Sequence, residues 1–195
     1  MMIGMTYLHL TGALALTAVS SEYPISVSPI VSLVEFVAII AIIVLITQAK
    51  PGPYKYFLFA AFAILIGQTL APLVDMYQAK GTLREVLASV AGIFLAMTAV
   101  GFIDNQNILG FGGYLFAALI GLVVGRLILL FTQFGDPNTD FAKANTLLNL
   151  FATALFAVYV AYDTQLLKQQ RNKDYINSSM GLFLDIINLF TSQSD

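Results

Sequence analysis

The sequence predicts an all-α membrane protein, a single domain over residues 1–195 with seven transmembrane helices. Of its 195 residues, 58% are hydrophobic and 10% are charged, and the mean hydropathy is +0.83. An ordinary soluble domain carries about 25% charged residues, so this chain has too few polar groups to cover a surface in water. The apolar residues also fall into seven runs, each near the ~20 residues that cross a bilayer.

The seven runs are separated by short polar, proline or glycine segments, with no linker and no internal repeat. The clearest break is Lys50-Pro51-Gly52-Pro53, because proline and glycine interrupt helices. The first run is interpreted as a membrane helix, since residues 1–5 lack the basic residues that open a signal peptide. The expected helices cover residues 3–20, 30–48, 54–77, 83–102, 114–134, 145–167 and 175–191.

The composition excludes several classes of chemistry. The chain has no cysteine, which excludes disulfides, thiolate metal sites and cysteine nucleophiles. His9 is the single histidine, so a catalytic triad would have one candidate base. The net charge is −2, and no basic patch indicates nucleic-acid binding. We therefore expect membrane lipid and other membrane proteins as partners, and no bound cofactor.

Two carboxylates within apolar runs carry the strongest functional signal. Asp163 lies near the end of the sixth run and Asp185 lies inside the seventh. A carboxylate in a membrane-spanning segment costs a few kcal/mol or more, so such residues face the interior of a bundle and are candidate functional residues. Asp163 and Asp185 are therefore the first candidates for a site.

The segment between the last two runs, residues 168–174, is polar and short, so the flanking helices should run antiparallel. At about 1.5 Å per residue, Asp163 and Asp185 then lie at comparable depths, within roughly two turns. At ~4 Å and an effective dielectric of ~20, two carboxylates repel by about 4 kcal/mol, enough to hold one proton between them near neutral pH. The alternative is a buried hydrogen-bonded pair that only holds the two helices together.

Two further charged residues lie inside apolar runs. Glu35 is about two turns into the second run, where it either faces the interior or is wetted at the interface. Arg126 lies about eight residues from the next polar loop, so a snorkelling route would have to cover ~12 Å. An acidic partner is favoured instead, Glu35 first and the aspartate pair second. Basic residues in the connections favour a cytosolic N-terminus; Lys50, Lys55, Lys168, Arg171 and Lys173 outnumber Lys80, Arg84 and Lys143.

Four other residues have expected supporting roles. Pro72 removes a backbone hydrogen bond inside the third run and should kink that helix. Tyr162 and Asn188 are expected to support the aspartates by hydrogen bonds, with interfacial packing as the alternative for Tyr162. Asp174 stands at the start of the seventh run, where a carboxylate caps free backbone amides.

These motifs resemble the transmembrane Bax inhibitor motif (Bax inhibitor-1) family. The resemblance rests on Tyr162-Asp163-Thr164-Gln165-Leu166, on Asp174-Tyr175-Ile176, on Leu184-Asp185-Ile186-Ile187-Asn188-Leu189-Phe190, on residues 67–73 and on Glu35. It implies a seven-helix fold with the last, short helix central. It also implies a pH-sensitive calcium leak governed by two aspartates that match Asp163 and Asp185.

The resemblance also implies a location and a role in the cell. The membrane would be the plasma membrane in a prokaryote and the endoplasmic reticulum or Golgi in a eukaryote or virus, with suppression of cell death in eukaryotes. One departure is Ile46, which stands where some bacterial relatives carry an Arg that latches the aspartate pair.

Two other functions compete with an ion leak. Intramembrane aspartyl proteases also pair two aspartates, one as base and one as acid, but their second motif is Gly-x-Gly-Asp. Here Leu182, Phe183 and Leu184 precede Asp185, and these bulky side chains would block a substrate strand, so we expect no enzyme. A non-conducting partner protein is the second alternative, with the small-residue row Ala117, Gly121 and Gly125 as its helix-contact face.

Overall fold

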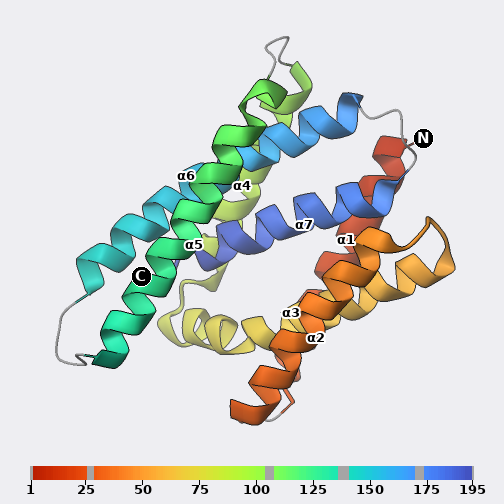
Figure 1. The fold of residues 1–195 in the computed structure, drawn as a ribbon. Helices are drawn as coiled ribbons and strands as arrows, with labels where there is room; N and C mark the ends of the chain where they lie inside the picture. Colours follow the sequence, from red (N-terminus) through yellow and green to blue (C-terminus); the bar gives the residue numbers. More distant parts are fainter. Residues whose placement is uncertain (1, 26–28, 104–107, 136–140, 170–173, 195) are drawn as a thin grey trace. The chain divides into compact units, whose positions relative to one another are not determined.

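A computed structural model describes residues 2–25, 29–103, 108–135, 141–169 and 174–194 (Figure 1). The regular structure of these residues is entirely helical, as predicted. The elements are α1 (Met2–Glu22), α2 (Pro29–Gln48), α3 (Pro53–Lys80), α4 (Leu83–Ile103), the short 3₁₀ helix η1 (Ile108–Phe111), α5 (Gly112–Gly135), α6 (Ala142–Gln169) and α7 (Tyr175–Thr191). The seven expected α-helices are confirmed.

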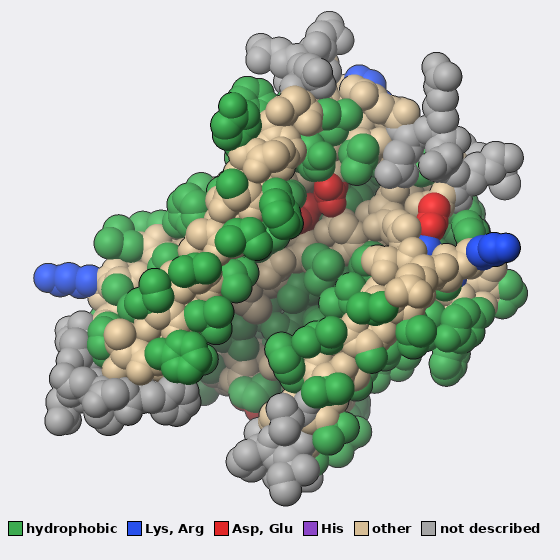
Figure 2. All heavy atoms as spheres, in the orientation of Figure 1, with side chains coloured by type: hydrophobic (Ala, Val, Ile, Leu, Met, Phe, Trp, Pro, Cys, Tyr) green, Lys and Arg blue, Asp and Glu red, His purple; other side chains and the backbone are tan. Residues whose placement is uncertain are grey.

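Within the described residues, five helical segments are long and apolar enough to cross a bilayer. They are α1, α3, α4, the segment Ile108–Thr132 and α6. The apolar stretch found in α2 is the shorter Val34–Gln48, and α7 has 17 residues. Hydrophobic side chains spread over the face drawn in Figure 2, and few acidic or basic ones interrupt them. The chain is an integral multi-pass membrane protein.

Two helix boundaries differ from the predicted ones by three residues, and the other differences are of one or two residues. α3 continues to Lys80, about one turn beyond the expected end, because Gly81 adopts the left-handed conformation (φ 73°) and its N–H donates to the carbonyl of Gln78 at 3.0 Å. A left-handed glycine is the common way to close a helix. α6 begins at Ala142, three residues early. Pro72 lies inside α3 without ending it.

The described residues form two compact units. The first unit combines Met1–Arg84 with Gln170–Phe183, and the second combines Glu85–Gln169 with Leu184–Asp195. Each unit therefore takes one part of α7, and the two units do not follow one another along the chain as successive domains would.

In the first unit, α1 and α3 approach closely at Gly67. A Cβ atom there would lie 2.5 Å from the carbonyl oxygen of Thr17 and 2.7 Å from Cβ of Ser20. The two hydroxyls also bond across this contact, since Thr17 donates to the carbonyl of Ala63 at 2.9 Å and Ser20 to that of Ile64 at 2.8 Å. Small residues that allow close approach, together with interhelical hydrogen bonds, commonly stabilise the contact between membrane helices.

The first part of α7 packs on α1 and α3 in the same unit. The ring of Phe183 makes edge contacts with Phe59 and Phe62, at centroid distances of 5.9 and 5.8 Å. Ser179 donates to the carbonyl of Thr6 at 2.8 Å. This contact joins residues at opposite ends of the sequence.

In the second unit, α6 packs against α4 and α5 through glycines. A Cβ atom at Gly101 of α4 would lie 2.6 Å from the carbonyl oxygen of Ala161 and 2.7 Å from Cβ of Thr164. At Gly125 of α5 the nearest atom would be Cδ2 of Leu148, at 3.2 Å. Gly125 therefore serves packing onto α6, whereas Gly121 faces open space.

The side chains of α7 are unusually well buried for so short a helix. Ile176, Leu182, Phe183 and Leu189 are at most 1% exposed, whereas α2 and α5 expose many large apolar side chains. The central position of α7 in the bundle stays a prediction.

Candidate functional site

The two aspartates come from facing helices of the second unit. Asp163 lies near the end of α6 and is half-buried, and Asp185 lies in α7 and is 5% exposed. Oδ2 of Asp185 is buried and has no hydrogen-bond partner among the described residues. A carboxylate oxygen left in this state is unfavourable unless a proton, a cation or water reaches it.

Hydrogen bonds near the end of α7 fix its register against α6. The hydroxyls of Thr153 and Ser192 are 2.8 Å apart, and the side-chain amide of Asn149 donates to the carbonyl of Ser194. Earlier residues of α6 thus meet later residues of the C-terminal segment, so the helices run antiparallel here, as predicted.

This register places the two aspartates at similar depths. Asp163 is about 15 Å along α6 from Thr153, and Asp185 is about 10 Å along α7 from Ser192, at about 1.5 Å per residue. The difference corresponds to about one turn. Direct sharing of one proton between the carboxylates stays a prediction.

Tyr159 is a further member of this group that the motifs do not single out. Its half-buried ring lies one turn before Asp163 on α6. Residues four apart share a helix face, so its spacing was the available signal. Two buried hydroxyls of the second unit, those of Thr98 and Thr164, also have no hydrogen-bond partner among the described residues.

Tyr162 and Asn188 are both expected to support the aspartates by hydrogen bonds, and the structure gives packing contacts for Tyr162. The hydroxyl of Tyr162 lies against Gly112 of α5, where a Cβ atom would come within 2.7 Å of it, and its ring contacts Tyr159 edge-on at 6.3 Å. These contacts correspond to the packing alternative. Asn188 lies three residues after Asp185 on the same face of α7, and a hydrogen bond from its side chain stays a prediction.

Arg126 has a neutral partner in place of the expected acidic one. Its guanidinium donates to the side-chain oxygen of Asn149 in α6, and Asn149 in turn binds the carbonyl of Ser194. Among the described residues, the hydrogen bond made by Arg126 is therefore with an amide rather than with Glu35 or the aspartates. An amide with both a donor and an acceptor can bridge a cation and a carbonyl, which apolar periodicity does not reveal.

The first unit contains a buried ion pair that the sequence does not predict. Nζ of Lys55 is 2.7 Å from Oδ2 of Asp174, and the Lys55 side chain is fully buried. Lys55 also donates to the carbonyl of Ala49 at 3.2 Å. Oδ1 of Asp174 accepts from the backbone N–H of Asn177 at 3.2 Å, so the predicted helix cap is confirmed.

Aromatic residues adjoin this pair. The hydroxyls of Tyr56 and Tyr175 share a short hydrogen bond. The ring of His9 lies 5.2 Å from that of Tyr56 and 5.1 Å from that of Tyr175, and its Nδ1 is 2.8 Å from the carbonyl oxygen of Met5. His9 is thus a packed and hydrogen-bonded residue of the bundle. Its contact with Tyr175 places the motif Asp174-Tyr175-Ile176 beside α1.

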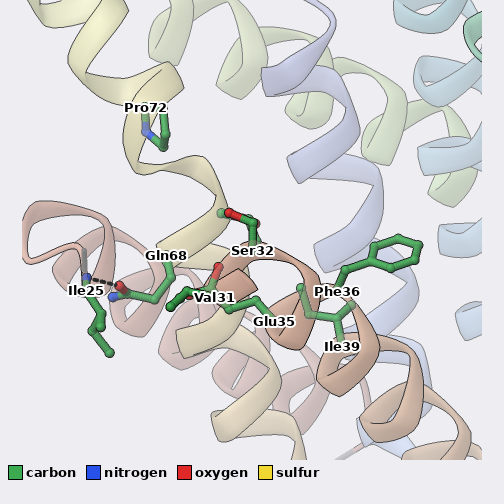
Figure 3. Close-up of a pocket in the computed structure, with 9 residues that line it drawn as sticks. Ile25, Val31, Ser32, Glu35, Phe36, Ile39, Gln68 and Pro72 are labelled. Atoms are coloured by element: carbon green, nitrogen blue, oxygen red, sulfur yellow. Dashed lines mark hydrogen bonds between the residues drawn. The ribbon is translucent and has the colours of Figure 1, made fainter. Parts of the chain in front are cut away.

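Glu35 and Pro72 line a separate cavity of about 280 Å³ in the first unit, between α2 and α3 (Figure 3). Glu35 is half-buried, and Ser32, Gln68 and Thr69 line the same cavity. The two alternatives for Glu35, facing the bundle interior or wetted at the interface, stay predictions.

Comparison with known proteins shows which family the sequence matches. A family model described as "Inhibitor of apoptosis-promoting Bax1" matches residues 1–192. The Bax inhibitor 1 of Schizosaccharomyces pombe is 31% identical over 156 residues, which are 80% of this chain and 56% of that protein. A Helicobacter pylori J99 protein is 32% identical over 195 residues, 96% of this chain and 81% of the relative.

A viral protein is similar as well. The Golgi anti-apoptotic protein of Vaccinia virus strain Lister is 28% identical over 165 residues, 84% of this chain and 66% of the viral protein. The chain spans less than two thirds of the length of the Schizosaccharomyces pombe protein. The match of the family model over nearly the whole chain nevertheless decides its membership: the chain belongs to the Bax inhibitor-1 family.

Proposed function

We propose that this chain is a pH-sensitive calcium leak channel whose proton-responsive site is the pair Asp163 and Asp185. The observation that carries the proposal is the state of Asp185: it is 5% exposed, one of its oxygens has no hydrogen-bond partner among the described residues, and the register of α6 and α7 puts Asp163 at a similar depth. Two such carboxylates are a poor way to stabilise a membrane bundle. They are well suited to bind a proton or a cation.

The proposed mechanism follows from the charge of the pair. With one shared proton, the carboxylates hold α6 and α7 together and carry one negative charge. With both deprotonated, they repel each other, which opens a path, and they offer the oxygen ligands that calcium prefers. The leak should therefore rise as the pH rises. The pair titrates as a unit, so its two ionisation steps belong to both residues.

Calcium is the transported ion in this mechanism, and the site must release it. A tight calcium site uses about six to eight oxygen ligands. Two carboxylates provide fewer, and among the described residues no group of three or more Asp, Glu or His could hold a metal ion. Weak binding favours permeation, because an ion bound too tightly between the carboxylates would bridge them and close the path.

Flux measurements in liposomes test the proposal. Purified wild-type protein should conduct calcium with a pH-dependent rate, and Asp163→Asn or Asp185→Asn should each flatten the pH response. Asp185→Asn should lower calcium affinity most, and Asp163→Asn should chiefly alter gating. The matched control is Asp75→Asn, because Asp75 is an exposed aspartate of α3 and its variant should behave as wild type.

Other outcomes would decide for a different function. A full wild-type pH response in both single variants would rule out the aspartate mechanism. Wild-type protein that adds no flux to empty liposomes would favour a non-conducting partner protein, and cleavage of a fluorogenic membrane peptide would favour a protease. An effect on ion homeostasis would follow from the leak, and so would an effect on cell death, which the name of the viral relative implies for that protein.

A further inference from the structure

The cavity between α2 and α3 is lined by both apolar and polar side chains (Figure 3). The apolar side chains are those of Ile25, Val31, Phe36 and Ile39. The polar side chains are those of Ser32, Glu35, Gln68 and Thr69, next to Pro72. An apolar cavity with a few polar groups is the usual form of a small-molecule site. Because the cavity measures about 280 Å³, it fits a small ligand or one end of a longer one.

Hydrogen bonds hold Gln68 in place. The side-chain amide of Gln68 donates to the carbonyl of Ser20 at 2.8 Å, and its oxygen accepts from the backbone N–H of Ile25 at 2.7 Å. Gln68 thus ties the end of α1 to α3 and fixes the edge of the cavity where Ile25 lies. Both polar atoms of the Gln68 side chain are therefore used in hydrogen bonds within the protein.

Apart from the Ser32 hydroxyl, which can both donate and accept, the groups left for a ligand are acceptors. The hydroxyl proton of Thr69 is donated to the carbonyl of Ile66 at 2.8 Å, which leaves oxygen lone pairs. Pro72 has no N–H, so the backbone carbonyl of Gln68 lacks its regular helical donor. A ligand in this cavity would therefore have to supply hydrogen-bond donors.

Glu35 gives the cavity its charge. Its side chain is half-buried, and it has no hydrogen bond or ion pair among the residues that the structure describes. The described residues that line the cavity include no lysine, arginine or histidine. An acidic side chain in a membrane helix normally has a cationic partner or an aqueous route, and here the cavity is where that partner would bind.

We propose that this cavity binds the primary ammonium group of a single-chain amphiphile, with Glu35 as its counter-ion and the alkyl chain along Phe36 and Ile39. A divalent metal ion fits less well, because it would need several anionic ligands and the cavity lining holds one carboxylate. Primary ammonium has three N–H donors, which suit the carboxylate of Glu35 and the hydroxyl oxygen of Thr69 in the same lining. This site is separate from the proposed leak, and its test does not depend on flux.

The test measures binding of n-octylamine to protein in phosphatidylcholine nanodiscs, by the ligand-induced rise in melting temperature. n-Octanol has the same chain without charge, and octyltrimethylammonium has the charge without N–H donors. We expect octylamine to bind roughly tenfold more tightly than either analogue, as charge-assisted hydrogen bonds require. Equal binding of octylamine and octanol would overturn the proposal, and so would displacement of octylamine by equimolar calcium.

Variants locate the site. Glu35→Gln should lose the preference for octylamine over octanol, whereas Glu85→Gln, the same change at an exposed residue of α4, should keep it. A Glu35→Gln variant that retains the wild-type preference would overturn the assignment. Nanodiscs that contain phosphatidylethanolamine distinguish the source of the amine, because weaker apparent octylamine binding there would identify the lipid headgroup as a competing occupant of the same site.

A labelling experiment leaves Glu35 intact and so does not depend on the folding of its variant. The chain has no cysteine, so Ser32→Cys introduces a single thiol at the cavity, and Thr132→Cys introduces one on exposed α5 as the control. Octylamine should slow thiosulfonate modification of the cysteine at position 32 severalfold and leave the control unchanged. Equal rates with and without octylamine at both positions would overturn the proposal.

Discussion

Two groups of buried charge, one in each unit, differ in how completely they are satisfied. In the first unit, Lys55 and Asp174 carry opposite charges at 2.7 Å, and each has a further hydrogen bond, to Ala49 and from Asn177. In the second unit, Asp163 and Asp185 carry like charges, and Oδ2 of Asp185 has no partner among the described residues.

The difference separates structure from function. A buried ion pair with its hydrogen bonds complete holds one arrangement, and the removal of either member leaves an uncompensated charge. Two like charges without donors contribute little to stability, and their state changes with the proton or cation available. The first group should therefore respond to mutation mainly in stability, and the second mainly in function.

The largest expected effect is on the ion pair. Asp174→Asn should lower the free energy of unfolding by about 3 to 5 kcal/mol, because Lys55 remains fully buried without its counter-charge. Asparagine caps helices as well as aspartate does, so the change isolates the charge from the cap. Unfolding by denaturing detergent in mixed micelles measures the effect.

The double variant Lys55→Met with Asp174→Asn sharpens this result. Removal of both charges leaves no buried charge behind, so the double variant should be more stable than Asp174→Asn alone. The exposed Asp75→Asn serves as the control. A loss below about 1 kcal/mol for Asp174→Asn would place the pair among solvent-screened surface pairs instead.

A smaller loss is expected for the arginine of the second unit. Arg126→Met should lower the free energy of unfolding by about 1.5 to 3 kcal/mol, the usual range for a hydrogen bond to a charged group. The reason is the bond from Arg126 to Asn149. The same unfolding assay applies, and no change in stability would mean that the guanidinium reaches the headgroups by snorkelling.

The helices and the two aspartates show which parts of the structure the sequence can predict. The helices follow from apolar runs and breaks, and Asp163 and Asp185 stand out because charge is rare in such runs. The antiparallel register of α6 and α7 follows from a short connection. Local pattern and composition are sufficient for all of these features.

The partners of buried charges could not be predicted in the same way. Lys55 is one of the basic residues counted toward a cytosolic N-terminus, yet its side chain is fully buried beside Asp174, which lies 119 residues away in the sequence. The amide of Asn149 similarly takes the place of an acidic partner for Arg126. Such contacts depend on how helices pack, and a single sequence does not contain that information.

A third, still smaller effect concerns the tyrosine pair beside the ion pair. Tyr56→Phe should cost about 1 kcal/mol, because it removes one hydroxyl of the hydrogen bond with Tyr175 and keeps the ring against His9. Tyr114→Phe is the control, since Tyr114 is 76% exposed. Equal melting temperatures of the two variants would show that the hydroxyl pair contributes nothing to stability.

The smallest effect on stability is expected where the effect on function is largest. Asp185→Asn should either lower the free energy of unfolding by less than about 1 kcal/mol or raise it. The substitution removes a buried charge, and Oδ2 of Asp185 has no hydrogen bond to lose among the described residues. An amide in the same place also ends the repulsion from Asp163 and adds a hydrogen-bond donor.

The gain in stability should be larger at alkaline pH, where both wild-type carboxylates are ionised and repel, than at acidic pH, where protonation already relieves the repulsion. Detergent unfolding at both pH values measures this difference, and Asp75→Asn should show none. A loss of several kcal/mol on Asp185→Asn, comparable to that of Asp174→Asn, would mean that the aspartates form a structural pair like the one in the first unit, and the contrast between the two groups would disappear.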